Sequence, residues 1–248
     1  MSTTQFYQMP DGRKLAFEHV PYFNAAFVFL PGYMSDKTGT KAQAVALDCE
    51  VLLYEYLAID YTGCGESDGS FADGTLSRWR DEVLEVISAK IECEKIVLIG
   101  SSMGGWLMLL VGMALGDRLA GMIGVAAAPD FSDWGYSEDQ KAKLRAGETI
   151  YEENPYGPEP TPTYSKFWRD AETHKLLDST IPLTCPVRLL HGSNDTEVPP
   201  EISWRLAKAL ASEDVTVTIV EGGDHRLSRE EDIHLLMKAV DDFQRVLF

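Results

Sequence analysis

Three things are scarce in this sequence: cationic residues, paired cysteines and long apolar runs. The sequence contains only 22 lysines and arginines but 39 aspartates and glutamates, which gives a formal net charge of −17. A surface of that sign repels nucleic acids and anionic membranes, so we expect no nucleic-acid partner. No stretch of about 20 apolar residues occurs, and the sequence therefore predicts no membrane-spanning helix.

The cysteine pattern argues against a metal centre. No two cysteines form a C-x-x-C pair, and their spacing fits no zinc-binding pattern, so we predict no metal site. Residues 1–12 contain neither an apolar run of signal length nor a basic cluster, which gives no indication of export. A disulfide framework in a secreted protein stays open, but we expect a cytoplasmic protein. The four cysteines are Cys49, Cys64, Cys93 and Cys185.

What the sequence does contain is a regular alternation of strand and helix patterns. Short apolar runs alternate with segments of helical periodicity, which favours the α/β class, with a mostly parallel central sheet and helices on both faces. The 248 residues are expected to form a single domain, 1–248, because single α/β domains often reach about 250 residues. Strands are predicted over 14–20, 25–30, 56–60, 95–101, 119–128, 187–191 and 215–220, and helices over 41–53, 78–91, 103–115 and 229–246.

One segment breaks this alternation. Residues 130–180 follow one predicted strand and precede another, and they are far longer than a normal crossover. We interpret this proline- and aromatic-rich segment as a small cap inserted over the carboxyl edge of the sheet. Its aromatic side chains are expected to wall an acyl pocket or, equally, to form a small core of their own. The candidates for the pocket are Trp134, Tyr164 and Trp168.

The strongest motif lies between a predicted strand and a predicted helix. Residues 100–104, GSSMG, match the pattern G-x-S-x-G, and the strand–turn–helix setting is the one that this pattern requires. The two glycines allow a tight turn that holds the central serine in a strained conformation. Ser102 is therefore the predicted nucleophile, and Ser101, at the variable position, is the alternative.

A serine nucleophile needs a base, and the base needs a carboxylate to orient it. With this motif the chain order is serine, acid, histidine. Asp195 follows the predicted strand 187–191, and His225 follows the last predicted strand. We therefore predict that Asp195 orients His225. Glu197 and Asp130 are the alternative acids.

The negative charge that develops on a reacting carbonyl needs two N–H donors. The first predicted donor is the backbone N–H of Met103, directly after the nucleophile. The second is expected from the loop after the strand 25–30. In that loop Gly32 lets the backbone turn close to the site, so the N–H of Tyr33 is the candidate.

Taken together, these motifs resemble the α/β-hydrolase superfamily. The resemblance rests on Gly100–Gly105, Leu30–Asp36, Asp60–Gly69, His191–Pro199 and Gly223–Arg226, which span nearly the whole chain in the right order. More narrowly, residues 100–110 and 224–227 look like the branch that contains the mitochondrial depalmitoylating and acyl-glucuronide esterase. The resemblance implies the α/β-hydrolase fold and hydrolysis of carboxylic esters or thioesters, with a serine–aspartate–histidine triad and no cofactor.

The expected function is therefore that of a serine hydrolase that forms an acyl-enzyme on Ser102. Its predicted substrate is a small-molecule acyl ester or thioester, or an acylated protein. A C–C bond hydrolase and a peptidase use the same triad, so both remain alternatives within enzymes. From another class, the alternative is a non-catalytic hydrolase-like binding protein.

Overall fold

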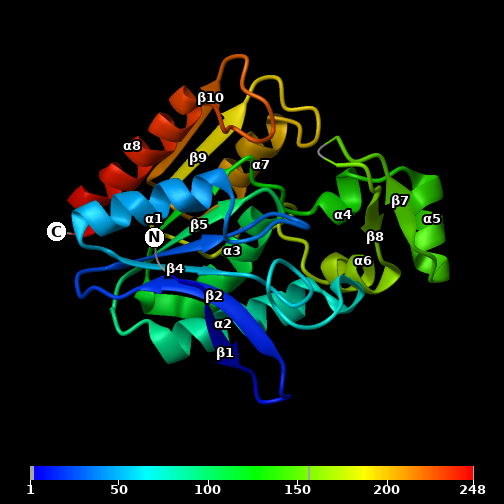
Figure 1. Ribbon diagram of the computed structural model, residues 1–248. Helices are drawn as coiled ribbons and strands as arrows, with labels where there is room; N and C mark the ends of the chain where they lie inside the picture. The colour runs from blue at the N-terminus through cyan, green and yellow to red at the C-terminus, as the bar shows by residue number, and fades with distance from the viewer. Residues whose placement is uncertain (1–2, 156, 248) are drawn as a thin grey trace.

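A twisted, mostly parallel sheet runs through the computed structural model, which describes residues 3–155 and 157–247 (Figure 1). Its eight strands lie in the order β1-β2-β4-β3-β5-β6-β9-β10. The pairs β1–β2 and β2–β4 are antiparallel, and the remaining pairs are parallel. This is the predicted α/β-hydrolase fold. The strands are β1 (Gln5–Gln8), β2 (Lys14–Val20), β3 (Ala26–Leu30), β4 (Glu55–Ile59), β5 (Ile96–Ser101), β6 (Leu119–Val125), β9 (Val187–Gly192) and β10 (Val215–Val220).

Helices cover both faces of this sheet. One face packs against α1 (Thr40–Leu52) and α8 (Glu230–Leu247), which also contact each other. The other face packs against α2 (Leu76–Lys90), α3 (Met103–Leu115) and α7 (Glu201–Ala209), as the ribbon in Figure 1 shows. Two short 3₁₀ helices, η1 (Phe71–Asp73) and η2 (Gly116–Arg118), complete this part of the chain. The sheet is thus covered on both sides, which explains its nearly continuous apolar strands.

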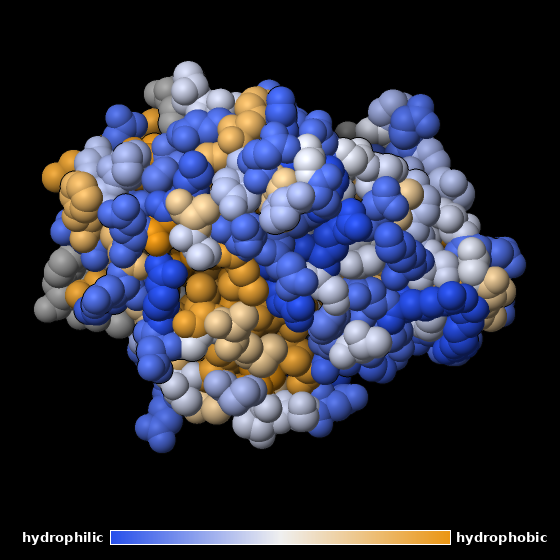
Figure 2. All heavy atoms as spheres, turned by 90° about the horizontal axis from the view of Figure 1, so that it is seen from below, coloured by the Kyte–Doolittle hydropathy of each residue, from blue (hydrophilic) through white to orange (hydrophobic). Residues whose placement is uncertain are grey.

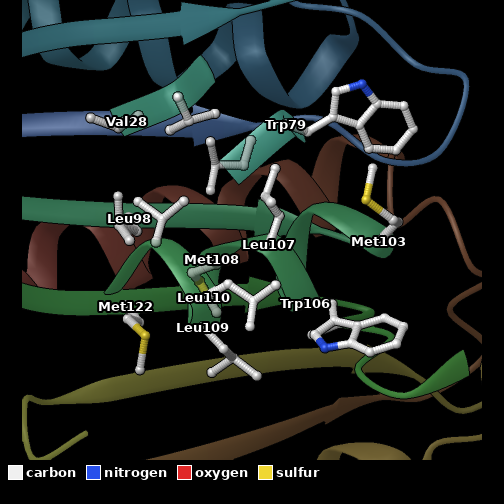
Figure 3. Packing of buried hydrophobic residues seen from close by; sticks show 14 of the residues in the cluster. Val28, Trp79, Leu98, Met103, Trp106, Leu107, Met108, Leu109, Leu110 and Met122 are labelled. Carbon is white, nitrogen blue, oxygen red and sulfur yellow. The ribbon is translucent and has the colours of Figure 1, made fainter. Parts of the chain in front are cut away.

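Helix α3 is apolar nearly all round because it is covered nearly all round. Its side chains Met103, Trp106 and Leu107 are fully buried and belong to one cluster with Val28 and Leu98 of the sheet (Figure 3). On its other side α3 contacts α2. The apolar burial fixes the start of α3 against the end of β5, where residues 101–103 form the turn.

The inserted segment, residues 130–180, is described over 130–155 and 157–180, and its helices and strands lie beside the sheet on the right of Figure 1. On the face seen from below in Figure 2, this side of the molecule is mostly hydrophilic or neutral, whereas hydrophobic residues gather near the middle. Trp106 of α3 donates to His174 O (3.1 Å), and Ser77 N of α2 donates to Asp170 (2.9 Å). The segment consists of α4 (Phe131–Trp134), α5 (Glu138–Ala146), the antiparallel strands β7 (Ile150–Glu152) and β8 (Thr161–Thr163), and α6 (Ser165–Glu172).

The structure differs from the sequence prediction at a few elements. Strand β1 was not predicted, because it is a four-residue edge strand with only alternating partial burial. Helix α7 was also not predicted. The predicted strand 119–128 ends at Val125, because Ala126 has a positive φ of 46° that breaks the extended backbone. None of the helices in the described part of the chain combines the length and the apolar character needed to cross a membrane.

We predict that Gly105→Ala destabilises the protein. A Cβ atom at Gly105 would lie 2.5 Å from Ala127 Cβ, so α3 would have to move away from the chain after β6. Overpacking of this kind should lower the free energy of unfolding by about 1–3 kcal/mol, measured by urea denaturation. Gly39→Ala is the control, because its Cβ would meet only Asp36 O at 3.8 Å. Equal stability of the two variants would contradict this account.

Candidate active site

A sharp turn between β5 and α3 carries Ser102. Its backbone has a φ of 55° and a ψ of −122°, a conformation that costs a non-glycine residue about 1–3 kcal/mol. A Cβ atom at Gly100 would lie 2.4 Å from Gly104 O, and one at Gly104 would lie 2.1 Å from Leu30 O. Glycine is therefore required at both positions, because the backbones of the turn and of β3 approach so closely.

Side chains from three distant parts of the chain meet at this turn. His225, in the loop after β10, lies with Nε2 3.1 Å from Ser102 Oγ. Its other ring nitrogen, Nδ1, lies 2.8 Å from Oδ2 of Asp195, in the loop after β9. Parallel strands place these loops at one edge of the sheet. The structure brings Ser102, and not Ser101, into hydrogen-bond contact with His225.

The carboxylate of Asp195 is fully buried and surrounded by N–H donors. Its Oδ1 accepts hydrogen bonds from the backbone N–H groups of Glu197 and Val198, both at 2.9 Å. Burial alone would raise the pKa of Asp195, but hydrogen bonds from His191 and His225 outweigh it and hold this pKa well below its ordinary value. The group therefore stays ionised at neutral pH, and an ionised carboxylate can only accept the Nδ1–H proton of His225.

The two alternative acids occupy other positions. Glu197 lies 3.9 Å from Nε2 of His225, the ring nitrogen that contacts Ser102, whereas Asp195 lies 2.8 Å from Nδ1. Asp130 is buried and accepts hydrogen bonds from the N–H groups of Leu176 and Leu177, each at 2.8 Å. It ties the two ends of the inserted segment together.

The loop after β3 passes close over Ser102. A Cβ atom at Gly32 would lie 3.3 Å from Ser102 Cβ, which places the following residue, Tyr33, beside the turn. Neither Tyr33 nor Met103 uses its backbone N–H to donate to an acceptor within residues 3–155 and 157–247. The Tyr33 hydroxyl donates to Pro162 O of β8 at 3.0 Å. This contact links the loop to the inserted segment.

A cavity of about 730 Å³ opens over Ser102 and His225. The inserted segment supplies Phe131, Trp134 and Tyr136 to its wall. Of the three aromatic residues predicted for the pocket, only Trp134 lines it. Phe131 and Tyr136 were missed, because no periodicity in this irregular segment indicates which side chains face the sheet.

The other two predicted pocket residues pack elsewhere. The Trp168 Nε1–H donates to Ser132 O at 2.9 Å, and the ring is buried in a small cluster within the inserted segment. The Tyr164 ring lies 6.4 Å from that of Phe71, between the segment and the body of the protein. The packing of Trp168 is that of the alternative prediction, in which the aromatics form a core of their own, whereas Tyr164 lies outside this cluster.

Lys41, in the first turn of α1, also lines the cavity. Its Nζ donates to the backbone oxygen of Arg226, next to His225. Burial, followed by the nearby charge of Arg226, lowers the pKa of Lys41 to about 8. Among the described residues, no group of three histidine, cysteine, aspartate or glutamate side chains is arranged to hold a metal ion.

Fold and site together define an α/β-type hydrolase. Residues 27–236 match the alpha/beta hydrolase family. The chain belongs to this family, and it is a hydrolase.

Relatives and solved structures agree with this assignment. The chain is 40% identical over 236 residues to the mitochondrial palmitoyl-protein thioesterase ABHD10 of Mus musculus, covering 92% of this chain and 78% of that protein. The structure of alpha/beta hydrolase domain-containing protein 10 from mouse superposes with a TM-score of 0.91 at 34% identity, covering 100% of both chains. A putative hydrolase from Agrobacterium vitis superposes with a TM-score of 0.90 at 32% identity, covering 100% of this chain and 99% of that one.

These relatives correct one expectation. The sequence pattern favoured a cytoplasmic protein, but the curated relatives from mouse, rat and human are all named as mitochondrial proteins. The cytoplasmic prediction was therefore wrong. It had relied on residues 1–12, and composition there is a weak indicator of location.

We predict a pH-dependent effect of Lys41→Met on stability. Because the pKa of Lys41 is lowered from 10.5 to about 8 by folding, the unfolded chain holds a proton that the folded chain releases between these values. Wild-type stability should therefore rise across this range relative to Lys41→Met, by about 1–3 kcal/mol. Urea denaturation at a series of pH values measures this, with the exposed Lys208→Met as control. Parallel pH profiles for wild type and Lys41→Met would contradict the lowered pKa of Lys41.

Proposed function

We propose that this chain hydrolyses carboxylic esters and acyl thioesters through an acyl-enzyme on Ser102. The observation that carries the proposal is the 3.1 Å contact between Ser102 Oγ and His225 Nε2 at the floor of an open cavity. The second contact, between His225 Nδ1 and the buried carboxylate of Asp195, supports it. A binding protein without catalysis would have no need of this chain of contacts.

The geometry supports a two-step reaction. Because Asp195 accepts the proton on Nδ1, the Nε2 of neutral His225 is bare and can take the hydroxyl proton of Ser102 as the oxygen attacks the acyl carbon. The resulting oxyanion is held by the N–H groups of Tyr33 and Met103. His225 then gives its proton to the leaving alcohol or thiol, and the acyl group stays on Ser102.

The second step repeats this chemistry with water. His225 takes a proton from a water molecule, whose oxygen attacks the acyl carbon, and the proton returns to Ser102 Oγ as the acid leaves. Each step needs only the base, its carboxylate and the two N–H donors. We therefore propose no cofactor for the reaction.

Acyl thioesters, including acylated proteins, are the substrates that we favour. The curated relatives from mouse, rat and human are named palmitoyl-protein thioesterases, and the cavity of this chain has apolar and aromatic side chains on its wall. We propose that the segment 130–180 acts as a cap within a single domain and holds the acyl chain against Trp134. Peptide and C–C bond hydrolysis are outcomes that a substrate panel would detect.

Ser102→Ala should lower kcat on p-nitrophenyl esters by roughly 10⁴–10⁶, because it removes the hydroxyl that lies 3.1 Å from His225 Nε2. Ser101→Ala tests the alternative nucleophile and should keep kcat within about tenfold of wild type. Steady-state kinetics on both variants decides between the two serines. Near wild-type turnover by Ser102→Ala would refute the proposed function.

The proposed acyl pocket predicts a length-dependent effect of Trp134→Ala. Removing this wall should lower kcat/KM for long-chain acyl thioesters by roughly tenfold while leaving acetyl thioesters nearly unchanged, since apolar contact with the chain is lost. The matched control is Trp204→Ala, because Trp204 is exposed on α7 and does not line the cavity. Equal loss at every chain length would mean that Trp134 does not contact the acyl group.

A further inference from the structure

The chain of contacts from Ser102 to Asp195 continues beyond the triad. His191, near the end of β9, is fully buried, and its Nε2 lies 3.2 Å from Asp195 Oδ2 and 2.9 Å from Val198 O. Its Nδ1 lies 2.7 Å from the hydroxyl of Ser203 on α7. A second imidazole therefore contacts the same carboxylate oxygen that holds His225.

The partners of His191 define where its proton lies. Val198 O is a backbone carbonyl and can only accept, so the neutral ring carries its proton on Nε2. The bare Nδ1 then accepts the hydroxyl proton of Ser203. Ser203 is also fully buried, so this contact is shielded from bulk solvent. The ring is thus held with its N–H toward Asp195.

The carboxylate of Asp195 consequently has four N–H donors around it. Two are backbone groups on Oδ1, and two are imidazoles on Oδ2. Each donor restrains the orientation of the carboxylate and weakens the electrostatic attraction between the carboxylate and the other donors. Removing the His191 donor would leave more of that charge for the His225 ring and less restraint on Oδ2.

We propose that His191, oriented by Ser203, is a positioning residue for Asp195 that sets the pH range in which His225 acts as a base. The proposal rests on the proposed function, because it concerns the same triad. Other charged groups face this region, and the test leaves them in place. They are Glu197 from the loop before α7, Lys41 from α1, and Asp224 and Arg226 on either side of His225.

Two amide substitutions separate positioning from packing. In His191→Gln the side-chain nitrogen is as many bonds from the backbone as Nε2 is, so it can donate to Asp195. In His191→Asn the nitrogen corresponds to Nδ1, so it reaches Ser203 but not Asp195. We expect the acidic limb of the pH profile of kcat/KM to move up by about half to one pH unit in His191→Asn. In His191→Gln it should return to near the wild-type position.

A role in packing alone gives a different result. It would lower thermal stability or kcat/KM at all pH values in both variants, without moving the limb. Superimposable pH profiles for wild type, His191→Asn and His191→Gln would overturn the proposal. If His191→Asn does not fold, Ser203→Ala carries the test, because it releases Nδ1 and should shift the limb in the same direction. An unshifted Ser203→Ala profile would then overturn the proposal.

Labelling with a fluorophosphonate probe separates this proposal from the proposed function. Wild-type protein that neither reacts with the probe nor hydrolyses esters would overturn both. A different result would overturn only the role of His191: the wild-type protein is labelled at Ser102 and hydrolyses esters, but the acidic limb of the kcat/KM profile stays at the same pH in the His191 variants. Proton NMR gives a second readout, since the downfield signal of the His225 Nδ1 proton should move in His191→Asn and return in His191→Gln.

Discussion

The site depends on one backbone constraint, the positive φ of 55° at Ser102. The conformation is unfavourable for serine, and it persists because the turn is packed between β3 and β6, beneath the cavity. Ser102 N donates to Val125 O at 2.9 Å, and Ser102 O accepts from Ala128 N at 3.0 Å. A side chain at Gly100 would collide with the backbone of Gly104, and one at Gly104 would collide with the backbone of Leu30 in β3. The packing of the core therefore determines where the Ser102 hydroxyl lies. Helix α3, which begins at this turn, is buried over most of its length.

The second constraint is the buried negative charge of Asp195. Hydrogen bonds from N–H groups stabilise this charge. The Asp195 carboxylate receives N–H groups from its own loop and from two histidines, and it lies fully buried beneath the cavity. A buried charge without such partners would be costly. The same arrangement orients His225 toward Ser102, so the groups that make the charge tolerable also prepare the base. Lys41, whose pKa is lowered to about 8, donates to the backbone oxygen of Arg226, the residue after His225.

Much of the fold followed from the sequence because its signals are local. Buried parallel strands are apolar runs, and the G-x-S-x-G turn requires its glycines, so β5, α3 and Ser102 could be located without coordinates. The order of the strands then indicated where Asp195 and His225 would lie. Tertiary packing decided the rest. Trp168 faces its own segment and Trp134 faces the cavity, and nothing in their neighbourhood in the sequence distinguishes them. The second imidazole on Asp195 was likewise missed, because His191 lies near the end of an apolar strand and nothing in the sequence shows which residues its ring contacts.

The central claim is that an acyl group passes through Ser102. Acid-quenching the protein within the first turnover of an acyl thioester, followed by mass spectrometry of its peptides, tests this most directly. The account predicts the mass of the acyl group on Ser102, and its disappearance as turnover is completed. Turnover with the acyl group on Ser101 or on a cysteine, or with no acylated peptide in any quenched sample, would contradict it.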